Sequence, residues 1–299
     1  MDELITEKIQ NTKIEKGIDY FGSVDAISIN GVIHNVGTRA LALSVLEKLG
    51  WKNKINFQDG LKHSGLLDGS VSVNKNETLF VIGRNGGVYF LDQDKWITEY
   101  EPDDLLVKKW GFKGNYDSEN DRIVISGGFS GKPSKYTANN TQTFVFKENK
   151  WSKVSNKILK QECKDNLDLR KSKPYENLSG ISVEQCYDFN LNKVVLLGEK
   201  YSYTLVGNKW EHHETKGLKE NISTDERKIF HVKHLKKTFI LNEDGILYEY
   251  SLKSLTPYAR IDLDDLDFLF YNCSCHYNDK KELLYLFGND GKGWSIKIS

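Results

Sequence analysis

Cys273, Cys275 and His276 are the residues best suited to chemistry, because together they form a Cys-x-Cys-His sequence. Thiolates and imidazoles bind metals, but a structural zinc site needs four such ligands. On a β-strand neighbouring side chains face opposite ways, so the cysteines would point away from the histidine. The spacing also differs from the Cys-x-x-Cys-His sequence that attaches haem. We interpret the cysteines as small packed side chains and predict no metal and no cofactor.

Other titratable residues cluster in places where a structural interpretation is simpler. His212 and His213, between Glu211 and Glu214, are predicted to alternate faces on a solvated outer strand. His231 lies on an expected inner strand, where it could face the central channel of the fold and sense pH. An acidic stretch lacks the glycine and glutamate of a calcium-binding EF-hand loop, so we interpret it as a hydrated connection: Asp262, Asp264, Asp265 and Asp267.

Sequence signatures of several enzyme classes are missing. The chain has no GxSxG nucleophile elbow, no HExxH zinc motif and no GxxxxGK[ST] phosphate loop. Each of these would place a nucleophile, a metal or a phosphate in a known way. We therefore assign no catalytic residue.

A repeat along the chain indicates which elements carry these residues. Three segments align without a gap, and each runs from an aromatic residue through a polar turn and an apolar strand to a glycine: Tyr116–Gly127, Tyr187–Gly198 and Tyr277–Gly288. Shorter copies end at Gly83 and Asn242. After each strand come a variable loop, a second apolar strand and a polar turn, and in three copies a tryptophan follows, at Trp96, Trp151 and Trp210. This pattern predicts units of four short strands, and a period of roughly 40–50 residues indicates a propeller or a solenoid.

The two ends of the chain complete the count of six units. Residues 25–37 lead to Gly37 and then to Trp51 in the same order, although residues 38–50 also fit an amphipathic helix. The last unit stops after its third strand and lacks an outer one. Residues 1–18 could supply that strand and close the fold, with a short helix as the alternative. We predict one all-β domain over residues 1–299, a six-bladed β-propeller with an inter-blade insertion at 156–180.

The order of apolar strand, glycine, variable loop, aromatic-rich strand, polar turn and tryptophan resembles that of kelch-repeat propellers. Gly127 and Gly128 reproduce the glycine doublet of that family, whereas Gly83, Gly198 and Gly288 stand alone. The resemblance implies that the first strand of each blade lines a central channel. It also implies that ligands meet the face built from the loops between second and third strands and from the connections between blades.

In this chain, the loops that correspond to that face contain the residues that we predict to bind a partner: Arg39, Arg84, Asn85, Lys135, Tyr136, Glu199, Lys200, Tyr201, Asp244, Asp290 and Lys292. Varied charged and aromatic loops on a regular scaffold favour a non-catalytic module that binds a protein or peptide. The alternative is a propeller that binds or modifies a sugar, because some kelch-like propellers isomerise or oxidise sugars.

Composition limits the remaining partners and the location. Lys and Arg number 42, as do Asp and Glu, so no net charge attracts the chain to nucleic acid or to an anionic membrane. The first ten residues carry acids where a signal peptide needs a basic flank, and no apolar run is long enough to cross a bilayer. Four cysteines in 299 residues do not make a disulfide framework. We expect a cytoplasmic protein that binds neither nucleic acid nor membrane.

Overall fold

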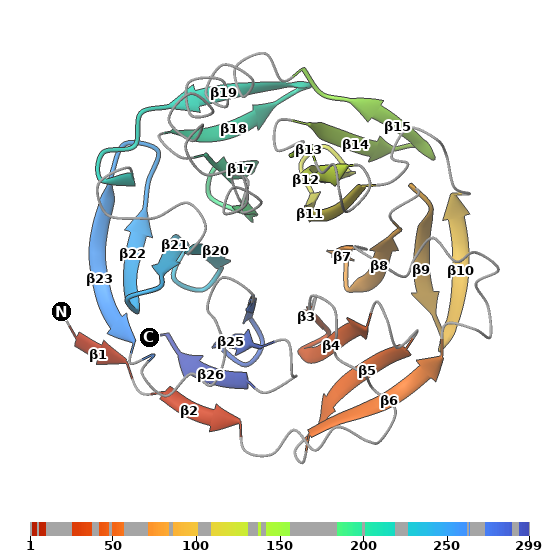
Figure 1. The fold of residues 1–299 in the computed structure, drawn as a ribbon, viewed down its shortest axis with the longest axis horizontal. Coiled ribbons are helices and arrows are strands. Elements are labelled where there is room, and N and C mark those ends of the chain that lie inside the picture. Colours follow the sequence, from red (N-terminus) through yellow and green to blue (C-terminus); the bar gives the residue numbers. More distant parts are fainter. Residues whose placement is uncertain are drawn as a thin grey trace. The chain divides into compact units, whose positions relative to one another are not determined.

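The computed structural model describes residues 2–4, 6–9, 26–37, 42–47, 50–56, 71–83, 86–100, 109–130, 137–138, 142–155, 184–198, 201–218, 227–261, 263, 273–288 and 293–298. These residues form antiparallel sheets of four or five short strands, six sheets in all, and the fold class is the predicted six-bladed β-propeller (Figure 1). Among the described residues no helix has the length and apolar character that a bilayer crossing requires.

The chain divides into two compact units, each of which holds three blades. Unit 1 comprises Met1–Lys108, Glu243–Gly245 and Ala259–Ser299, and unit 2 comprises Lys109–Asn242 and Ile246–Tyr258. Within each unit, the inner strands of consecutive blades contact one another. The prediction that residues 1–299 form one domain stays a prediction.

Unit 1 contains blades 1, 2 and 6. Blade 1 is β3 (Ala26–Ile29), β4 (Val32–Gly37), β5 (Ala42–Glu47) and β6 (Gly50–Asn56). Blade 2 is β7 (Val71–Lys75), β8 (Thr78–Ile82), β9 (Val88–Asp92) and β10 (Lys95–Tyr100). Blade 6 is β24 (Ser274–Asn278), β25 (Leu283–Phe287), β26 (Gly293–Lys297) and β2 (Thr6–Ile9).

Unit 2 contains blades 3, 4 and 5, except for three short parts of blade 5 that belong to unit 1: β1, Glu243–Gly245 and the end of β23 from Ala259. Blade 3 is β11 (Lys109–Asp117), β12 (Arg122–Ser130), β13 (Thr137–Ala138), β14 (Thr143–Lys147) and β15 (Lys150–Lys153). Blade 4 is β16 (Glu184–Asp188), β17 (Lys193–Leu197), β18 (Ser202–Val206) and β19 (Lys209–His213). Blade 5 is β20 (Arg227–Val232), β21 (Lys237–Asn242), β22 (Ile246–Tyr250), β23 (Leu255–Ile261) and β1 (Asp2–Leu4).

The second strand of blade 4 shows why these strands are apolar throughout. Val194 and Leu196 pack in a cluster with side chains of blade 3, whereas Val195 and Leu197 pack in a cluster with side chains of blade 5. Side chains alternate along a strand, so a sheet covered on both faces needs an apolar residue at every position. The core of the protein therefore lies between blades.

Two tryptophans of the fourth strands, Trp96 and Trp210, pack in the spaces between blades. Trp210 of β19 shares a cluster with Val145 and Val154 of blade 3, and its indole Nε1 donates to Thr143 Oγ1 at 3.0 Å. Trp96 of β10 packs in the same way in a cluster with residues of blade 1.

Residues at the ends of the inner strands close their own turns and bind the next blade. Asn278 Oδ1 accepts from the backbone N–H groups of Lys280 and Lys281, while its Nδ2 donates to Gly31 O of blade 1 at 3.0 Å. Asn74 of blade 2 likewise donates from Nδ2 to Ser28 O of blade 1 at 2.8 Å. A short asparagine side chain can do both because its oxygen accepts within its own turn while its amide nitrogen donates to the neighbouring blade.

The N-terminal segment supplies outer strands to two blades. β2 pairs antiparallel with β26, so the strand that blade 6 lacks comes from the other end of the chain, as the fold prediction expected, and the helical alternative for this segment is wrong. β1 pairs in parallel with the end of β23, which was not predicted.

Two further details differ from the sequence-based alternatives. Residues 42–47 form strand β5, so the helix considered for residues 38–50 is wrong. A fifth strand was not expected in blade 3, where β12 continues to Ser130 and pairs there with the short β13. The insertion at 156–180 lies outside the described residues.

Gly245 provides a test of the packing of blade 5. Its φ is +77°, its carbonyl accepts from Ile261 N–H at 2.8 Å, and a Cβ at this position would overlap the Ile261 carbonyl oxygen. Gly207 also has a positive φ, +55°, but a Cβ there would meet nothing within 4 Å. We expect Gly245→Ala to lower the free energy of unfolding by about 2–4 kcal/mol and Gly207→Ala by about 1 kcal/mol, measured by urea titration. Equal losses of stability in the two variants would contradict the close packing of Gly245 against Ile261.

Candidate functional site

The connections between strands differ in length at the two ends of each blade. In blades 1 to 5 consecutive strands form an antiparallel meander, so the first and third hairpin turns lie at one end, here the turn side, and the remaining connections lie at the other, here the loop side. Blade 6 has the same strand order, with β2 as its fourth strand. Described turns on the turn side are two to four residues long. On the loop side, the connections that follow β6, β10 and β15 span residues 57–70, 101–108 and 154–183. The longest connections between strands are therefore on the loop side.

Two of the predicted partner-binding residues are described. Tyr201 precedes β18 on the loop side of blade 4, is half-buried, and contacts His212 edge-on with ring centroids 5.6 Å apart. Asp244 lies exposed beside Glu243 in the connection between β21 and β22. The other nine lie outside the described residues: Arg39, Arg84, Asn85, Lys135, Tyr136, Glu199, Lys200, Asp290 and Lys292.

A buried arginine holds the strand end from which one of these loops starts. The Arg227 side chain is buried at the beginning of β20, and its Nη2 donates to the carbonyl oxygens of Leu197 and Gly198 at 3.0 and 2.6 Å. Charge-assisted hydrogen bonds of this kind are stronger than neutral ones. Arg227 of blade 5 therefore fixes the start of the loop that carries Glu199, Lys200 and Tyr201 in blade 4.

A row of charged side chains joins the inner strands of unit 2. Lys113, Glu184 and Lys228 occupy the same position in β11, β16 and β20, and the Glu184 carboxylate lies 3.2 Å from Lys113 Nζ and 3.6 Å from Lys228 Nζ. Burial alone would raise the pKa of Glu184, but the two ammonium groups outweigh it and hold the pKa below its usual value. The carboxylate therefore stays ionised and links three blades.

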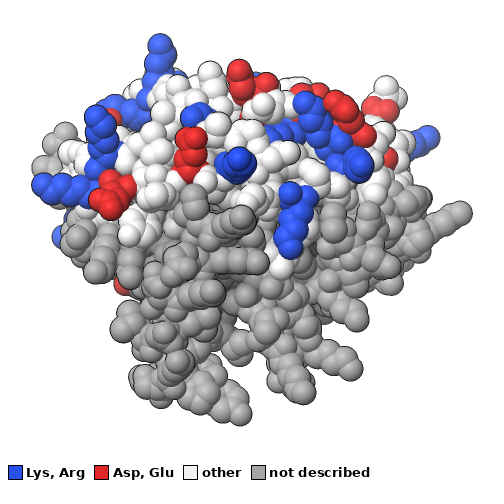
Figure 2. Space-filling model, turned by 90° about the horizontal axis from the view of Figure 1, so that it is seen from above, with Lys and Arg blue, Asp and Glu red and all other residues white. Residues whose placement is uncertain are grey.

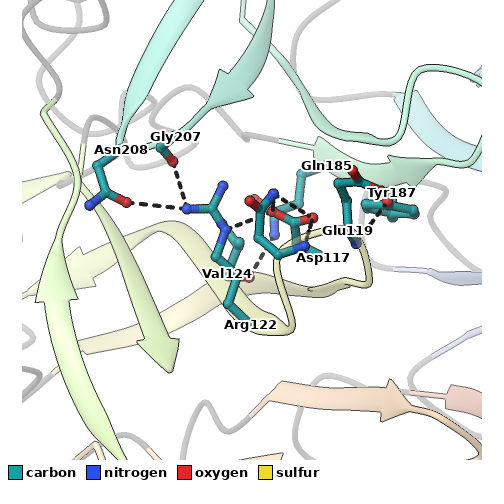
Figure 3. Close-up of polar contacts among 9 residues, drawn as sticks. Asp117, Glu119, Arg122, Val124, Gln185, Tyr187, Gly207 and Asn208 are labelled. Atoms are coloured by element: carbon teal, nitrogen blue, oxygen red, sulfur yellow. Dashed lines mark hydrogen bonds and ion pairs between the residues drawn. The ribbon is translucent and has the colours of Figure 1, made fainter. Parts of the chain in front are cut away.

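A second polar network joins blades 3 and 4 at the turn side (Figure 3). Buried Arg122 donates from Nε to Asp117 Oδ2 at 2.6 Å and from Nη1 to Gly207 O at 2.6 Å and Asn208 Oδ1 at 3.2 Å. Gln185 of β16 donates from Nε2 to Val124 O of β12 at 3.0 Å. Each of these polar groups contacts a neighbouring strand or turn, so the network stabilises the scaffold.

Asp188 and His231 approach each other between blades 4 and 5. Thr238 Oγ1 donates to Asp188 Oδ2 at 2.7 Å and lies 2.8 Å from His231 Nδ1, which is 3.8 Å from Asp188 Oδ1. Because the threonine hydrogen goes to the carboxylate, Nδ1 of His231 donates to Thr238. His231 is buried on the turn side, at the opposite end of its strand from the loops. Its arrangement favours a contact between blades over the pH-sensing role considered from the sequence.

The Cys-x-Cys-His sequence lies on and just before β24. Cys273 is buried, Cys275 is half-buried, and neither forms a disulfide. His276 Nε2 accepts from the backbone N–H of Ser28 in blade 1 at 2.9 Å, and burial lowers the pKa of His276 to about 4. Among the described side chains, no three His, Cys, Asp or Glu residues cluster closely enough to hold a metal ion.

The remaining clusters from the sequence have separate outcomes. His212 is exposed beside Tyr201, whereas Nε2 of His213 forms a hydrogen bond with Thr204 Oγ1 at 2.8 Å, so the two rings lie apart as predicted. Asp262, Asp264, Asp265 and Asp267 lie outside the described residues.

Comparisons with known proteins establish the fold and no family. No family model matches the chain, and no curated protein matches its sequence. A solved structure of a protein of unknown function from Bacteroides thetaiotaomicron is 9% identical, with a TM-score of 0.58, over 100% of this chain and 74% of that one. A gluconolactonase candidate is 8% identical, with a TM-score of 0.58, over 98% and 92% of the two chains. A catalytically inactive virginiamycin B lyase from Staphylococcus aureus, solved with quinupristin, is 10% identical, with a TM-score of 0.50, over 92% and 80%.

The charged residues between blades were not predicted from the sequence. Lys113 and Glu184 stand at equivalent positions of the aligned segments, three residues before Tyr116 and Tyr187, so comparing the copies position by position could have suggested a charged row. Arg227 has no such signal, because its partners are backbone carbonyls of another blade.

His276 makes the stability of the protein depend on pH. Its pKa is about 4 in the folded protein and about 6.5 when unfolded, so below pH 6.5 the unfolded chain binds a proton that the folded chain does not. Stability from this residue is complete above pH 6.5 and is lost as the pH falls towards 4. Part of the surface of residue His276 remains exposed, so we expect the free energy of unfolding to fall by roughly 2 kcal/mol over this range, measured by thermal unfolding at stepped pH.

The matched variant is His276→Gln, whose side-chain oxygen can accept the same hydrogen bond without titrating. Its stability should change less than that of the natural chain between pH 6.5 and 4. Identical pH profiles would show that His276 does not carry this dependence.

Proposed function

We propose that this chain is a non-catalytic, kelch-like propeller that binds a protein or peptide partner through its loop side. The observation that carries the proposal is the difference between the two ends of the blades: described turns on the turn side have two to four residues, and the longest connections lie on the loop side. Binding residues are commonly found on loops held by a rigid scaffold.

The contacts of the buried charged residues support this proposal. Arg227, Glu184 and Lys228 bind strands of other blades, and Arg227 holds the base of a predicted binding loop. A loop with a fixed base loses less conformational freedom when it binds, which favours affinity. Tyr201, half-buried at the base of that loop, is an aromatic contact of the kind that is common at interfaces.

The proposed setting is the cytoplasm, and the proposed partner is neither nucleic acid nor membrane. The described cysteines Cys186, Cys273 and Cys275 form no disulfide with one another, which is compatible with a reducing compartment. Lys, Arg, Asp and Glu side chains are interspersed across the described surface in Figure 2, so that view shows no extended field of one sign.

Charge reversal on the loop side tests the proposal. We expect the double variant with Arg84→Glu and Lys200→Glu to bind its partner roughly tenfold or more weakly, because each reversed charge would repel the group that the natural side chain attracts. The melting temperature of the double variant should be unchanged. Partners are collected on the immobilised natural chain, identified by mass spectrometry, purified and measured by calorimetry. Lys95→Glu, at an exposed turn-side position, is the matched control.

Unchanged affinity of the double variant for the purified partner would contradict binding through this face.

The sugar-binding or sugar-modifying alternative makes a different prediction. In a thermal-shift screen of monosaccharides and acidic sugars, a ligand at 100 times its dissociation constant would stabilise the chain by about 2.7 kcal/mol. Such a shift, together with no retained protein, would replace the proposal by that alternative.

A further inference from the structure

Phe189 is an exposed aromatic residue at a turn position that is polar in other blades. It opens the four-residue turn between β16 and β17, and 41% of its surface is exposed. The corresponding first residues of the turns in blades 3, 5 and 6 are Ser118, Lys233 and Asp279. The turn itself is closed by Asp188, whose Oδ1 accepts from two of its backbone N–H groups, so its geometry does not depend on Phe189.

The Phe189 ring is nevertheless held in a defined place. Its centroid lies 4.9 Å from that of Tyr187, edge-on, and 5.4 Å from that of His231, and Lys233 Nζ lies 4.1 Å from it. Asn190, the next residue, donates from Nδ2 to Lys236 O in the adjacent turn of blade 5. An exposed apolar side chain that is already ordered loses little freedom when a partner covers it.

The turns beside Phe189 on blades 4 and 5 carry lysines and no acidic residue. The turns 189–192, 207–208 and 233–236 contain no acidic residue, and several lysines lie in them or directly after them: Lys193, Lys209, Lys233, Lys236 and Lys237. Of these, Lys237 pairs with Glu249 at 2.8 Å. The chain as a whole has no net charge, so these turns form a local basic surface. A second apolar side chain, Val206, is 37% exposed at the turn side of blade 4.

We propose that the turn side of blades 4 and 5 around Phe189 is a second docking surface, separate from the loop side, and that it binds an acidic peptide segment with an apolar side chain. The apolar side chain would cover Phe189. A carboxylate would bind Lys233, because an ammonium group has three donors and can contact a ring and an anion together.

The geometry favours a peptide over a nucleic acid. A stacked base needs an open face of the Phe189 ring, and Lys233 Nζ lies over one face, whereas an apolar side chain can contact the ring from any side. Glu119 and Asp121 are exposed on the blade 3 side of Tyr187. These two carboxylates would repel a phosphate backbone that crossed them, whereas a short peptide could place its own carboxylates on the lysine side of Phe189.

Selection from a peptide library tests this proposal directly on the whole chain. A phage library of random peptides of about 12 residues is selected on the immobilised chain, and enriched peptides are synthesised and measured by fluorescence anisotropy at low and high salt. We expect a class rich in Asp and Glu with an apolar residue. Its affinity should fall roughly tenfold in Phe189→Ser and several-fold in Lys233→Gln, and it should weaken with salt.

Ile97→Ser is the matched control, because Ile97 is 40% exposed on β10, away from blades 4 and 5 in sequence, and it should leave affinity unchanged. Lys233→Gln keeps the test valid if Phe189→Ser lowers the melting temperature. The proposal is wrong if no acidic class is enriched, or if every enriched peptide binds both variants as tightly as the natural chain. It is also wrong if a single-stranded oligo-thymidine binds and loses affinity in the same two variants. Peptides weakened only by Lys200→Glu would report on the loop side instead.

Discussion

A four-stranded sheet of this size cannot cover both of its faces, so each blade depends on apolar contact with a neighbour. Each described hydrophobic cluster contains residues of two blades, and β17 is apolar along its whole length because its alternate side chains enter two such clusters. Burying these faces is the constraint from which the repeating glycines, tight turns and tryptophans follow.

The polar contacts between blades then fix how neighbouring sheets are placed. Asn74, Asn278 and Thr238 each bind an adjacent blade near a turn, and Arg122 and Glu184 do the same with full charges. A buried charge without its partner is costly, so a misplaced blade would be strongly destabilised. The charged residues inside the scaffold are thereby explained by structure, and the residues that could select a partner lie on its surface.

The strands and the turns could be predicted because they depend on local pattern. The N-terminal strand of blade 6 was suggested by the missing outer strand of the last unit, because its local pattern also fits a helix. Alternation, glycine and the position of Trp96 or Trp210 repeat along the chain and can be read from one copy to the next. The bonds of Arg227 and His276 could not be predicted, since their partners are backbone groups of other blades. Phe189 was missed because a single aromatic residue in a polar turn acquires meaning only when its exposure and its contact with Lys233 are known.

The most direct test of this account is hydrogen exchange, followed by mass spectrometry, in the variant Trp210→Ala. Trp210 lies on β19 of blade 4, but its hydrogen bond and part of its packing are with blade 3. If blades are held by their shared faces, exchange should become faster in β14 of blade 3 as well as in β18 and β19. Faster exchange confined to blade 4 would contradict the claim that the core of this protein lies between its blades.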